Sequence, residues 1–320
     1  MTDLPIPGRV RGRFAPSPTG RLHLGNARSA LLGWLQARAA GGEFLLRIED
    51  LDQGRCRPEY LESLYRDLEY LGLGWDETPL IQSQRGANYE EALERLRAAG
   101  RSYPCFCTRA EISRAASAPH GLSEEGPRYP GTCRELSSQE VEQRRAERTP
   151  ALRFRTPPGE VSFVDAVHGP QRQDVDAVVG DFVVRKNDGV ASYQLAVVVD
   201  DAVSAITHVL RGDDLLSSTA RQIQLYQTQG WRPPLFAHVP LLIGHDGKRM
   251  AKREGASAVG ELREARVPAE RVIGLLASWS GLGDGSPISA AELAGEFSLE
   301  RIPRAPVMVS EEEIRGRLGI

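Results

Sequence analysis

The spacing of apolar residues near the start of the chain predicts a strand, a helix and a second strand. Residues 9–16 (RVRGRFAP) form a short extended segment, and from Ala27 to Leu35 apolar residues recur at the i, i+3, i+4, i+7 and i+8 positions of one helical face. Two glycines at 41–42 end this helix. Residues 43–52 (EFLLRIEDLD) then form the second strand. The unit predicts an α/β fold with a Rossmann-like, doubly wound parallel sheet.

The segments that follow these two strands are candidate ligand-binding sites. Ligands of doubly wound sheets bind at the carboxyl ends of the strands. The residues expected there are APSPTG (15–20) and EDLD (49–52). Because a proline ring fixes its own φ, Pro16 and Pro18 stiffen the first of these turns. We therefore expect a rigid corner immediately before the helix that begins around His23.

Further elements follow from periodicity and turn residues. Single apolar faces predict helices near 58–71 and 89–100. Between Tyr103 and Pro150 the periodicity fades and Cys, Pro, Gly, Ser and charged residues dominate, which indicates an insertion. We expect β structure to return over 151–156, 161–167, 181–199 (with a hairpin turn at 187–189) and 205–212.

The last third of the chain is expected to be helical apart from one strand. Ser217 and Ser218 are suited to cap a helix from about Thr219 to Gln229. A strand near 238–243 then leads through a tight turn at 246–247 into a basic loop, and helices follow from about 269. We therefore divide the chain into a Rossmann-like catalytic domain (1–100 and 150–240), an insertion (101–149) and a C-terminal region (241–320).

Composition narrows the class of protein. The chain has 320 residues and a net charge of −3. It therefore lacks the overall positive charge of a protein that coats nucleic acid non-specifically, and any contact with nucleic acid must be local. No apolar run approaches the ~18 residues that cross a bilayer, and the N-terminus lacks the pattern of a secretion signal. A cytoplasmic protein without a membrane partner is expected. Its four cysteines then favour metal binding or plain burial over disulfides.

Two distant segments carry the main chemical signal. HLGN at 23–26 and RMAKR at 249–253 resemble the HIGH and KMSKS signatures of class I aminoacyl-tRNA synthetases. Taken singly, a histidine before a helix, as in HLGN, is more often structural than catalytic. The alternative for RMAKR is a solvent-exposed basic hairpin. Together with LLRIEDLD, ASYQLAVVVDD and VLRGDDLLSST, however, they resemble the glutamyl branch of that class in sequence, order and spacing over about the whole chain.

The resemblance implies an ATP-dependent ligase that activates L-glutamate as glutamyl-adenylate, with Mg²⁺ accompanying ATP. Because the attacking carboxylate is already ionised at pH 7, the reaction needs positioning and charge neutralisation rather than a general base. Here the resemblance implies His23 and Lys252 as catalytic residues, and Ala251 replaces the usual serine of the second signature. The implied ATP-binding residues are Pro16, Thr19, His23, Gly25, Asn26, Arg249, Met250 and Lys252.

The resemblance also implies a pocket for glutamate. Arginine suits the carboxylates, and an acid suits the α-ammonium group. The implied pocket residues are Arg13, Ala15, Ser17, Glu49, Tyr193 and Arg211, with Glu49 on the ammonium and Tyr193 with Arg211 on a carboxylate. Full-length glutamyl enzymes tend to carry an amide where Val197 stands, so this chain departs from them there.

A zinc module completes the resemblance. CFCTR and RYPGTCR supply Cys105, Cys107, Tyr129 and Cys133, which resemble the family's ligands for one structural Zn²⁺. Soft ligands grouped at the two ends of a loop suit a tetrahedral ion that fastens that loop. Tyrosine is an unusual ligand, so His120 or Cys56 are alternatives to Tyr129, and buried reduced thiols are the alternative to a metal site.

Length selects a branch within the family. Only 67 residues follow Arg253, which predicts that the chain has no anticodon-binding domain. The chain resembles a shortened branch of the family without that domain, and this resemblance implies that it esterifies glutamate to the cyclopentene diol of queuosine, in the anticodon wobble position of tRNA(Asp). A monomer is expected. The alternatives are a short glutamyl enzyme that charges the tRNA 3′ end, a ligase that adenylates a metabolite, and an inactive nucleic-acid-binding paralogue.

Overall fold

A computed structural model describes residues 9–115, 127–244 and 258–320 of the chain. The strands are β1 (Arg11–Phe14), β2 (Glu43–Ile48), β3 (Leu80–Ile81), β4 (Ser102–Cys105), β5 (Ala151–Phe154), β6 (Glu160–Asp165), β7 (Gly169–Asp174), β8 (Val183–Arg185), β9 (His208–Gly212), β10 (Leu235–Val239), β11 (Leu242–Ile243) and β12 (Val307–Met308). The helices are α1 (Leu24–Ala39), α2 (Pro58–Tyr70), α3 (Gly86–Ala98), α4 (Arg109–Ala115), α5 (Ser138–Glu147), α6 (Val175–Val178), α7 (Tyr193–Val203), α8 (Leu216–Thr228), α9 (Val259–Glu264), α10 (Ala269–Ser278), α11 (Ala290–Ala294) and α12 (Glu311–Leu318).

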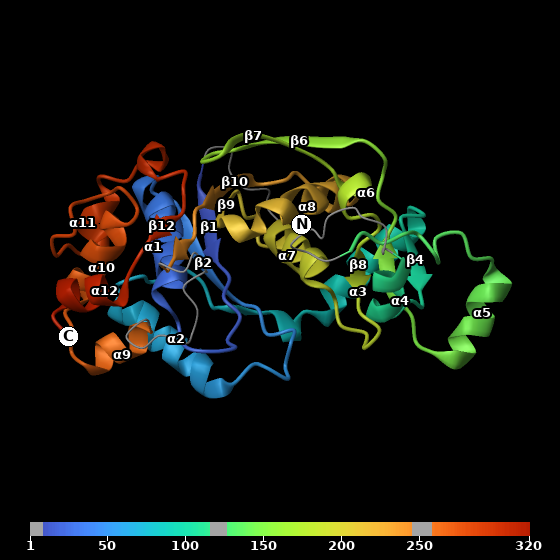
Figure 1. Cartoon of the computed structure of the whole chain (residues 1–320), viewed down its shortest axis with the longest axis horizontal. Coiled ribbons are helices and arrows are strands. Elements are labelled where there is room, and N and C mark those ends of the chain that lie inside the picture. The colour runs from blue at the N-terminus through green and yellow to red at the C-terminus, as the bar shows by residue number, and fades with distance from the viewer. Residues whose placement is uncertain (1–8, 116–126, 245–257) are drawn as a thin grey trace.

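Parallel strands form the middle of the molecule (Figure 1). β1, β2 and β3 pair in parallel, and β10 pairs in parallel with both β9 and β6. β9 lies beside β1, because the N–H of Thr207 donates to the carbonyl of Arg11 at 2.9 Å just before β9 begins. The expected strand–helix–strand unit at 9–52 and its parallel sheet are confirmed.

Helices cover both faces of these strands, as a doubly wound arrangement requires. Phe44 and Leu46 of β2 belong to a core that α1 and α10 share, whereas Leu45 between them belongs to a second core with α3, α7 and α8. This alternation follows from the two-residue period of a strand. Both cores are apolar, so the sheet is buried on its two faces. A ligand can therefore reach the sheet only at the ends of its strands.

Several local expectations hold. Pro58 is the first residue of α2, where the missing N–H of proline costs nothing. The turn at 187–189 is present, with the N–H of Lys186 donating to the carbonyl of Val190 at 2.8 Å and Gly189 at φ +86°. The C-terminal helices expected from about 269 are α10 to α12, and α9 precedes them; all four pack at the end of the molecule opposite α5 (Figure 1).

Two expectations are wrong. Residues 193–199, expected as strand, begin α7, because the side chain of Ser192 caps this helix by accepting the N–H of Leu195. Five successive residues of α7, Leu195–Val199, are buried, so the segment shows no helical period in sequence. α8 begins at Leu216 and not at Thr219, and its N-cap Leu215 makes no side-chain cap, so Ser217 and Ser218 lie within its first turn.

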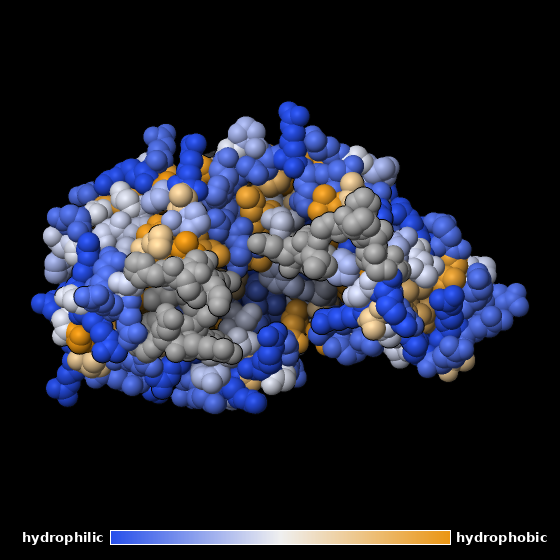
Figure 2. Space-filling model, in the orientation of Figure 1, coloured by the Kyte–Doolittle hydropathy of each residue, from blue (hydrophilic) through white to orange (hydrophobic). Residues whose placement is uncertain are grey.

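The insertion extends from the strands through β4. This strand pairs antiparallel with β5, which pairs in turn with β8, and the small core of the insertion gathers around Tyr103, Phe106 and Tyr129. Figure 2 shows the face of the molecule hollowed between the insertion at one end and the C-terminal helices at the other. No helix within the described ranges is long and apolar enough to cross a bilayer.

Candidate functional site

The rigid corner before α1 fixes the ring of His23. This residue is the N-cap of α1, and its Nδ1 accepts the N–H of Asn26 at 3.2 Å. The neutral ring therefore carries its proton on Nε2, which makes that nitrogen a hydrogen-bond donor. A Cβ at Gly25 would lie 3.1 Å from Nδ1, so a side chain at position 25 would displace the ring. The corner thus presents one histidine donor beside the N–H groups of a helix N-terminus, which favour anions.

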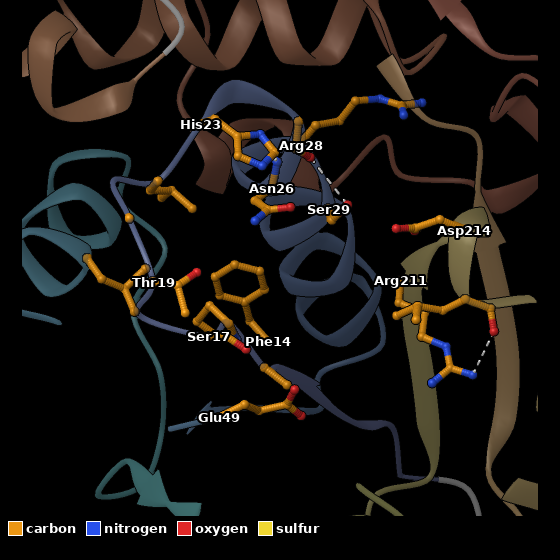
Figure 3. A pocket seen from close by; sticks show the side chains of 18 of the residues that line it. Phe14, Ser17, Thr19, His23, Asn26, Arg28, Ser29, Glu49, Arg211 and Asp214 are labelled. Carbon is orange, nitrogen blue, oxygen red and sulfur yellow. Dashed lines mark hydrogen bonds between the residues drawn. The ribbon is translucent and has the colours of Figure 1, made fainter. Parts of the chain in front are cut away.

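The predicted ATP and glutamate residues converge on one cavity. Its volume is about 440 Å³, and it lies where β1, β2 and β9 end and α1 begins. Figure 3 shows His23 and Asn26 on one side, Glu49 on another and Arg211 with Asp214 on a third. Every predicted ATP- or glutamate-binding residue within the described ranges lines it: Arg13, Ala15, Pro16, Ser17, Thr19, His23, Gly25, Asn26, Glu49, Tyr193 and Arg211.

The other predicted ATP residues, Arg249, Met250 and Lys252, lie outside the described residues, as does the expected turn at 246–247. The residues that flank this segment do contact the site. Leu242 lines the cavity, and the N–H of Val259 donates to the carbonyl of Leu22 at 2.8 Å. Ala258 also forms an antiparallel bridge with His23. The described residues on either side of positions 245–257 therefore lie beside the cavity.

Two arginines near the cavity are neutralised by buried acids. Arg13 donates to Asp201 at 3.1 Å, and Arg47 pairs with both Asp201 and Glu49, the latter at 3.1 Å. Burial raises the pKa of Glu49, and Arg47 and Arg13 oppose this shift. The group of two arginines and two carboxylates is therefore balanced in charge, with Glu49 at the cavity wall.

Arg211 differs from these arginines because its hydrogen-bond partners are neutral. It is 5% exposed, and its guanidinium donates to His238 (3.0 Å), Thr219 (3.0 Å) and Gln222 (2.8 Å). Among the described residues, no carboxylate forms an ion pair with it, and burial lowers its pKa. The hydroxyl of Tyr193 lies 3.5 Å from Nη1. Among the described residues no carboxylate is bonded to the buried Arg211 cation, although Glu49 and Asp214 also line the cavity, and an anionic ligand would satisfy it.

Three cysteine sulfurs and one tyrosine hydroxyl gather in the insertion. The sulfurs of Cys105, Cys107 and Cys133 all lie within 4.8 Å of one another. Those of Cys107 and Cys133 are 3.6 Å apart, and the Tyr129 oxygen is 3.4 Å from Cys105 and 3.9 Å from Cys107. A tetrahedral ion with bonds of about 2.3 Å to sulfur separates its ligand sulfurs by about 3.8 Å. The buried cluster could therefore bind a metal such as zinc.

The alternative ligands do not join this cluster. Cys56 precedes α2 and is not among the grouped sulfurs, whereas His120 lies outside the described residues. Hydrogen bonds from Cys133, Tyr129 and Arg153 lower the pKa of the Cys105 thiol, and burial opposes this shift. Arg153 donates to the Cys105 sulfur at 3.2 Å and lies over the Tyr129 ring, so a positive charge supports this end of the cluster.

Comparison with known proteins decides the family. A protein-family model described as "tRNA synthetases class I (E and Q), catalytic domain" matches residues 9–315 of this chain. A glutamyl-Q tRNA(Asp) synthetase of Symbiobacterium thermophilum is 54% identical over 96% of this chain and 98% of its own length. One of Nitratidesulfovibrio vulgaris is 46% identical, again over 98% of its length. The chain belongs to the glutamyl-Q tRNA(Asp) synthetase family. It is thereby a ligase with the class I synthetase catalytic fold.

Longer relatives of the glutamyl-Q tRNA(Asp) synthetase family share the same catalytic fold. Glutamate–tRNA ligase 2 of Alkalilimnicola ehrlichii is 42% identical, and the chain covers 67% of it. The crystal structure of a glutamate tRNA ligase from Elizabethkingia meningosepticum, in complex with its amino acid, superposes with a TM-score of 0.83 at 30% identity. The match covers 97% of this chain and 68% of that one.

Sequence reasoning missed several buried polar residues at this synthetase site. Arg47 and Asp201 belong to the charge-balanced group that also contains Arg13 and Glu49. Asp165 and His238 lie behind Arg211, and Arg28 lines the cavity. The available signal was a charged or polar residue within an apolar run, such as Arg47 in EFLLRI or His238 in LFAHV. A buried polar group needs a partner, so such positions indicate a network even when its members cannot be named.

Proposed function

We propose that this chain activates L-glutamate with ATP and transfers the glutamyl group to the cyclopentene diol of queuosine, at the wobble position of tRNA(Asp). One observation supports the choice of glutamate above others. Arg211, a buried arginine without a carboxylate partner among the described residues, lines the same cavity as the anion-binding start of α1. The cavity therefore suits a phosphate chain and an acidic side chain at the same time.

Adenylation would be assisted by donors around the α-phosphate. The glutamate α-carboxylate attacks the α-phosphorus and pyrophosphate leaves, so negative charge grows on the phosphate oxygens. The Nε2–H of His23 and the N–H groups at the start of α1 offer fixed donors to these oxygens. Pro16, Thr19, Gly25 and Asn26 line the proposed ATP pocket. Arg249, Met250 and Lys252, which lie outside the described residues, complete the proposed ATP-binding set. Mg²⁺ accompanies ATP.

Glutamate would be held at both ends. Arg211 forms charge-assisted bonds with one carboxylate, Tyr193 donates its hydroxyl to the same group, and Glu49 accepts the α-ammonium. Arg13, Ala15 and Ser17 line the wall beside it. Because Arg13 is already paired with Asp201, its part is to shape and polarise the pocket, and Arg211 carries the net charge that selects an acidic side chain.

The choice of acceptor rests on the relatives. The proteins named glutamyl-Q tRNA(Asp) synthetase match over 98% of their length in two cases, whereas the glutamate–tRNA ligases match over about two thirds of theirs. This supports queuosine in tRNA(Asp) over the tRNA 3′ end. ATP and tRNA are cytoplasmic substrates and the cysteine cluster suits a reducing compartment, so the enzyme would work in the cytoplasm, as a monomer.

Glutamate-dependent exchange of pyrophosphate into ATP tests the first half-reaction. His23→Ala should lower the exchange rate about 100-fold, since it removes a donor to developing charge, while the KM for glutamate changes little. The matched control is His208→Ala, at the first residue of β9 and outside the residues that line the cavity, which should leave the exchange rate near wild type. Absence of exchange in the wild type, or equal effects of the two variants, would contradict this assignment.

We further propose that Cys105, Cys107, Tyr129 and Cys133 bind one structural Zn²⁺. Cys105→Ser should abolish stoichiometric zinc and increase protease sensitivity between Tyr103 and Pro150, because a small core of this kind depends on its metal. Elemental analysis and limited proteolysis measure both effects. Cys56→Ser is the matched control and should retain one zinc. A wild-type protein purified without chelator that contains no zinc would rule the site out.

A further inference from the structure

A buried chain of three side chains leads from Arg211 away from the cavity. The Nε–H of Arg211 donates to Nε2 of His238 at 3.0 Å, and Nδ1–H of His238 donates to Asp165 at 2.6 Å. The side chains of His238 and Asp165 are both 0% exposed. Since Nδ1 carries the proton that bonds to Asp165, Nε2 of the neutral ring is the acceptor that Arg211 needs.

Asp165 is a fixed anchor for this chain. It is the last residue of β6, and its carboxylate accepts the backbone N–H groups of Val167 (3.0 Å), His168 (2.9 Å) and His238 (3.1 Å). The ring of His238 is therefore tied to the backbone of two neighbouring strands, β6 and β10, through one carboxylate. Second-layer partners of this kind decide which tautomer and orientation a histidine adopts.

The ring remains neutral at physiological pH. Burial lowers the pKa of His238 to about 4, although its bond to Asp165 opposes the shift. A protonated ring would point a second N–H donor at the Nε–H of Arg211 and would place two cations 3.0 Å apart. Neutral His238 thus accepts from Arg211 without cancelling the positive charge that an anionic ligand would meet.

The partners of Arg211 leave one edge of the guanidinium toward the cavity. His238 takes Nε, and Thr219 and Gln222 take Nη2 at 3.0 and 2.8 Å. Nη1 lies toward Tyr193, whose hydroxyl is 3.5 Å away and which lines the cavity (Figure 3 shows Arg211 at its wall). The guanidinium is therefore held at two of its three nitrogens by groups that have no charge of their own.

We propose that His238, anchored by Asp165, is a positioning residue that turns the Nη1 edge of Arg211 toward the carboxylate of the bound amino acid. The inference rests on the proposed function, in which Arg211 binds that carboxylate. It adds a requirement: the affinity for glutamate depends on a hydrogen-bond acceptor for Arg211 Nε at the position of His238 Nε2, with Arg211 lying between this acceptor and the substrate. His238 itself does not touch the substrate.

A matched pair of amides tests this role. Asparagine at position 238 can reach Asp165 as Nδ1 does but leaves Arg211 Nε without its acceptor, whereas glutamine can place an oxygen near the position of Nε2. In pyrophosphate exchange, His238→Asn should raise the KM for glutamate about 10- to 100-fold, and the KM for ATP should stay within about twofold. His238→Gln should recover most of the loss in glutamate KM.

The same assay separates failure of this inference from failure of the proposed function. Arg211→Met is measured beside the two amides, and the thermal midpoint of each variant is recorded. If Arg211→Met raises the glutamate KM and His238→Asn does not, the positioning role is overturned alone. If Arg211→Met leaves the glutamate KM unchanged, the carboxylate assignment falls and takes the inference with it. Equal rises in the KM for glutamate and ATP in both amide variants would show a merely structural role.

Discussion

Radiolabelled glutamate should be transferred to tRNA(Asp) that carries queuosine and not to the same tRNA made without it. In the first tRNA the wobble base bears a cyclopentene diol whose hydroxyl can attack the glutamyl-adenylate, and in the second a guanine offers no such hydroxyl. Because the two tRNAs have the same 3′ end, the comparison isolates the acceptor. The expected contrast is close to all or none, measured as acid-precipitable label in the presence of ATP.

Removing the 3′-terminal adenosine gives the sharper form of this experiment. Queuosine-containing tRNA(Asp) shortened in this way should accept glutamate as well as the intact molecule does, whereas a short enzyme that charges the 3′ end would lose its acceptor. tRNA(Glu) that lacks queuosine serves as the negative control. Equal labelling of tRNA(Asp) with and without queuosine would refute the proposed acceptor, even if the adenylation step behaves as expected.

Arg211→Met should raise the KM for glutamate by about 150- to 5,000-fold, since loss of one partner of a buried, hydrogen-bonded charge pair costs about 3–5 kcal/mol. The physical reason is the charge balance around the cavity. Arg13 and Arg47 are paired with Asp201, whereas Arg211 has neutral partners among the described residues. Initial rates of glutamate-dependent pyrophosphate exchange give both KM values, and the KM for ATP should change much less.

Two comparison variants interpret this result. Arg211→Lys keeps the charge but not the two-pronged geometry, so its glutamate KM should fall between those of the wild type and Arg211→Met. Arg172→Met removes an exposed arginine of β7, 73% exposed at the side chain, and should leave both KM values near wild type. If Arg211→Met and Arg172→Met behaved alike, another group would have to supply the cation for glutamate.

The parts of the fold that were predictable had local signals. The corner at 15–23, the cap of α1 and the start of α2 each follow from proline, glycine or a capping side chain close in sequence. α7 was not predictable by periodicity, because it is buried along successive residues and so loses the contrast between its faces. Its only local sign was Ser192, three residues before Leu195, whose N–H it accepts.

The site divides in the same way. Positions within the signature segments could be assigned by resemblance, and the cavity brings His23, Glu49 and Arg211 together. The bonds that give these residues their charge state could not be assigned, because they join residues far apart in the chain. Arg47 and Asp201 are 154 positions apart, and His238 and Asp165 are 73 apart. Neither pairing follows from any spacing rule, only from the order of strands and helices in space.

The pairing of β4 with β5 has a consequence for how the insertion can be altered. Cys105 is the last residue of β4 and lies opposite Ala151, so the cysteine cluster is continuous with the strands that lead to Tyr193 through β8. An engineered chain from which residues 101–149 had been excised would leave β5 as a bare outer strand. Such a strand offers unpaired N–H and C=O groups to any neighbouring molecule, and the shortened enzyme would self-associate in addition to losing its cysteine cluster.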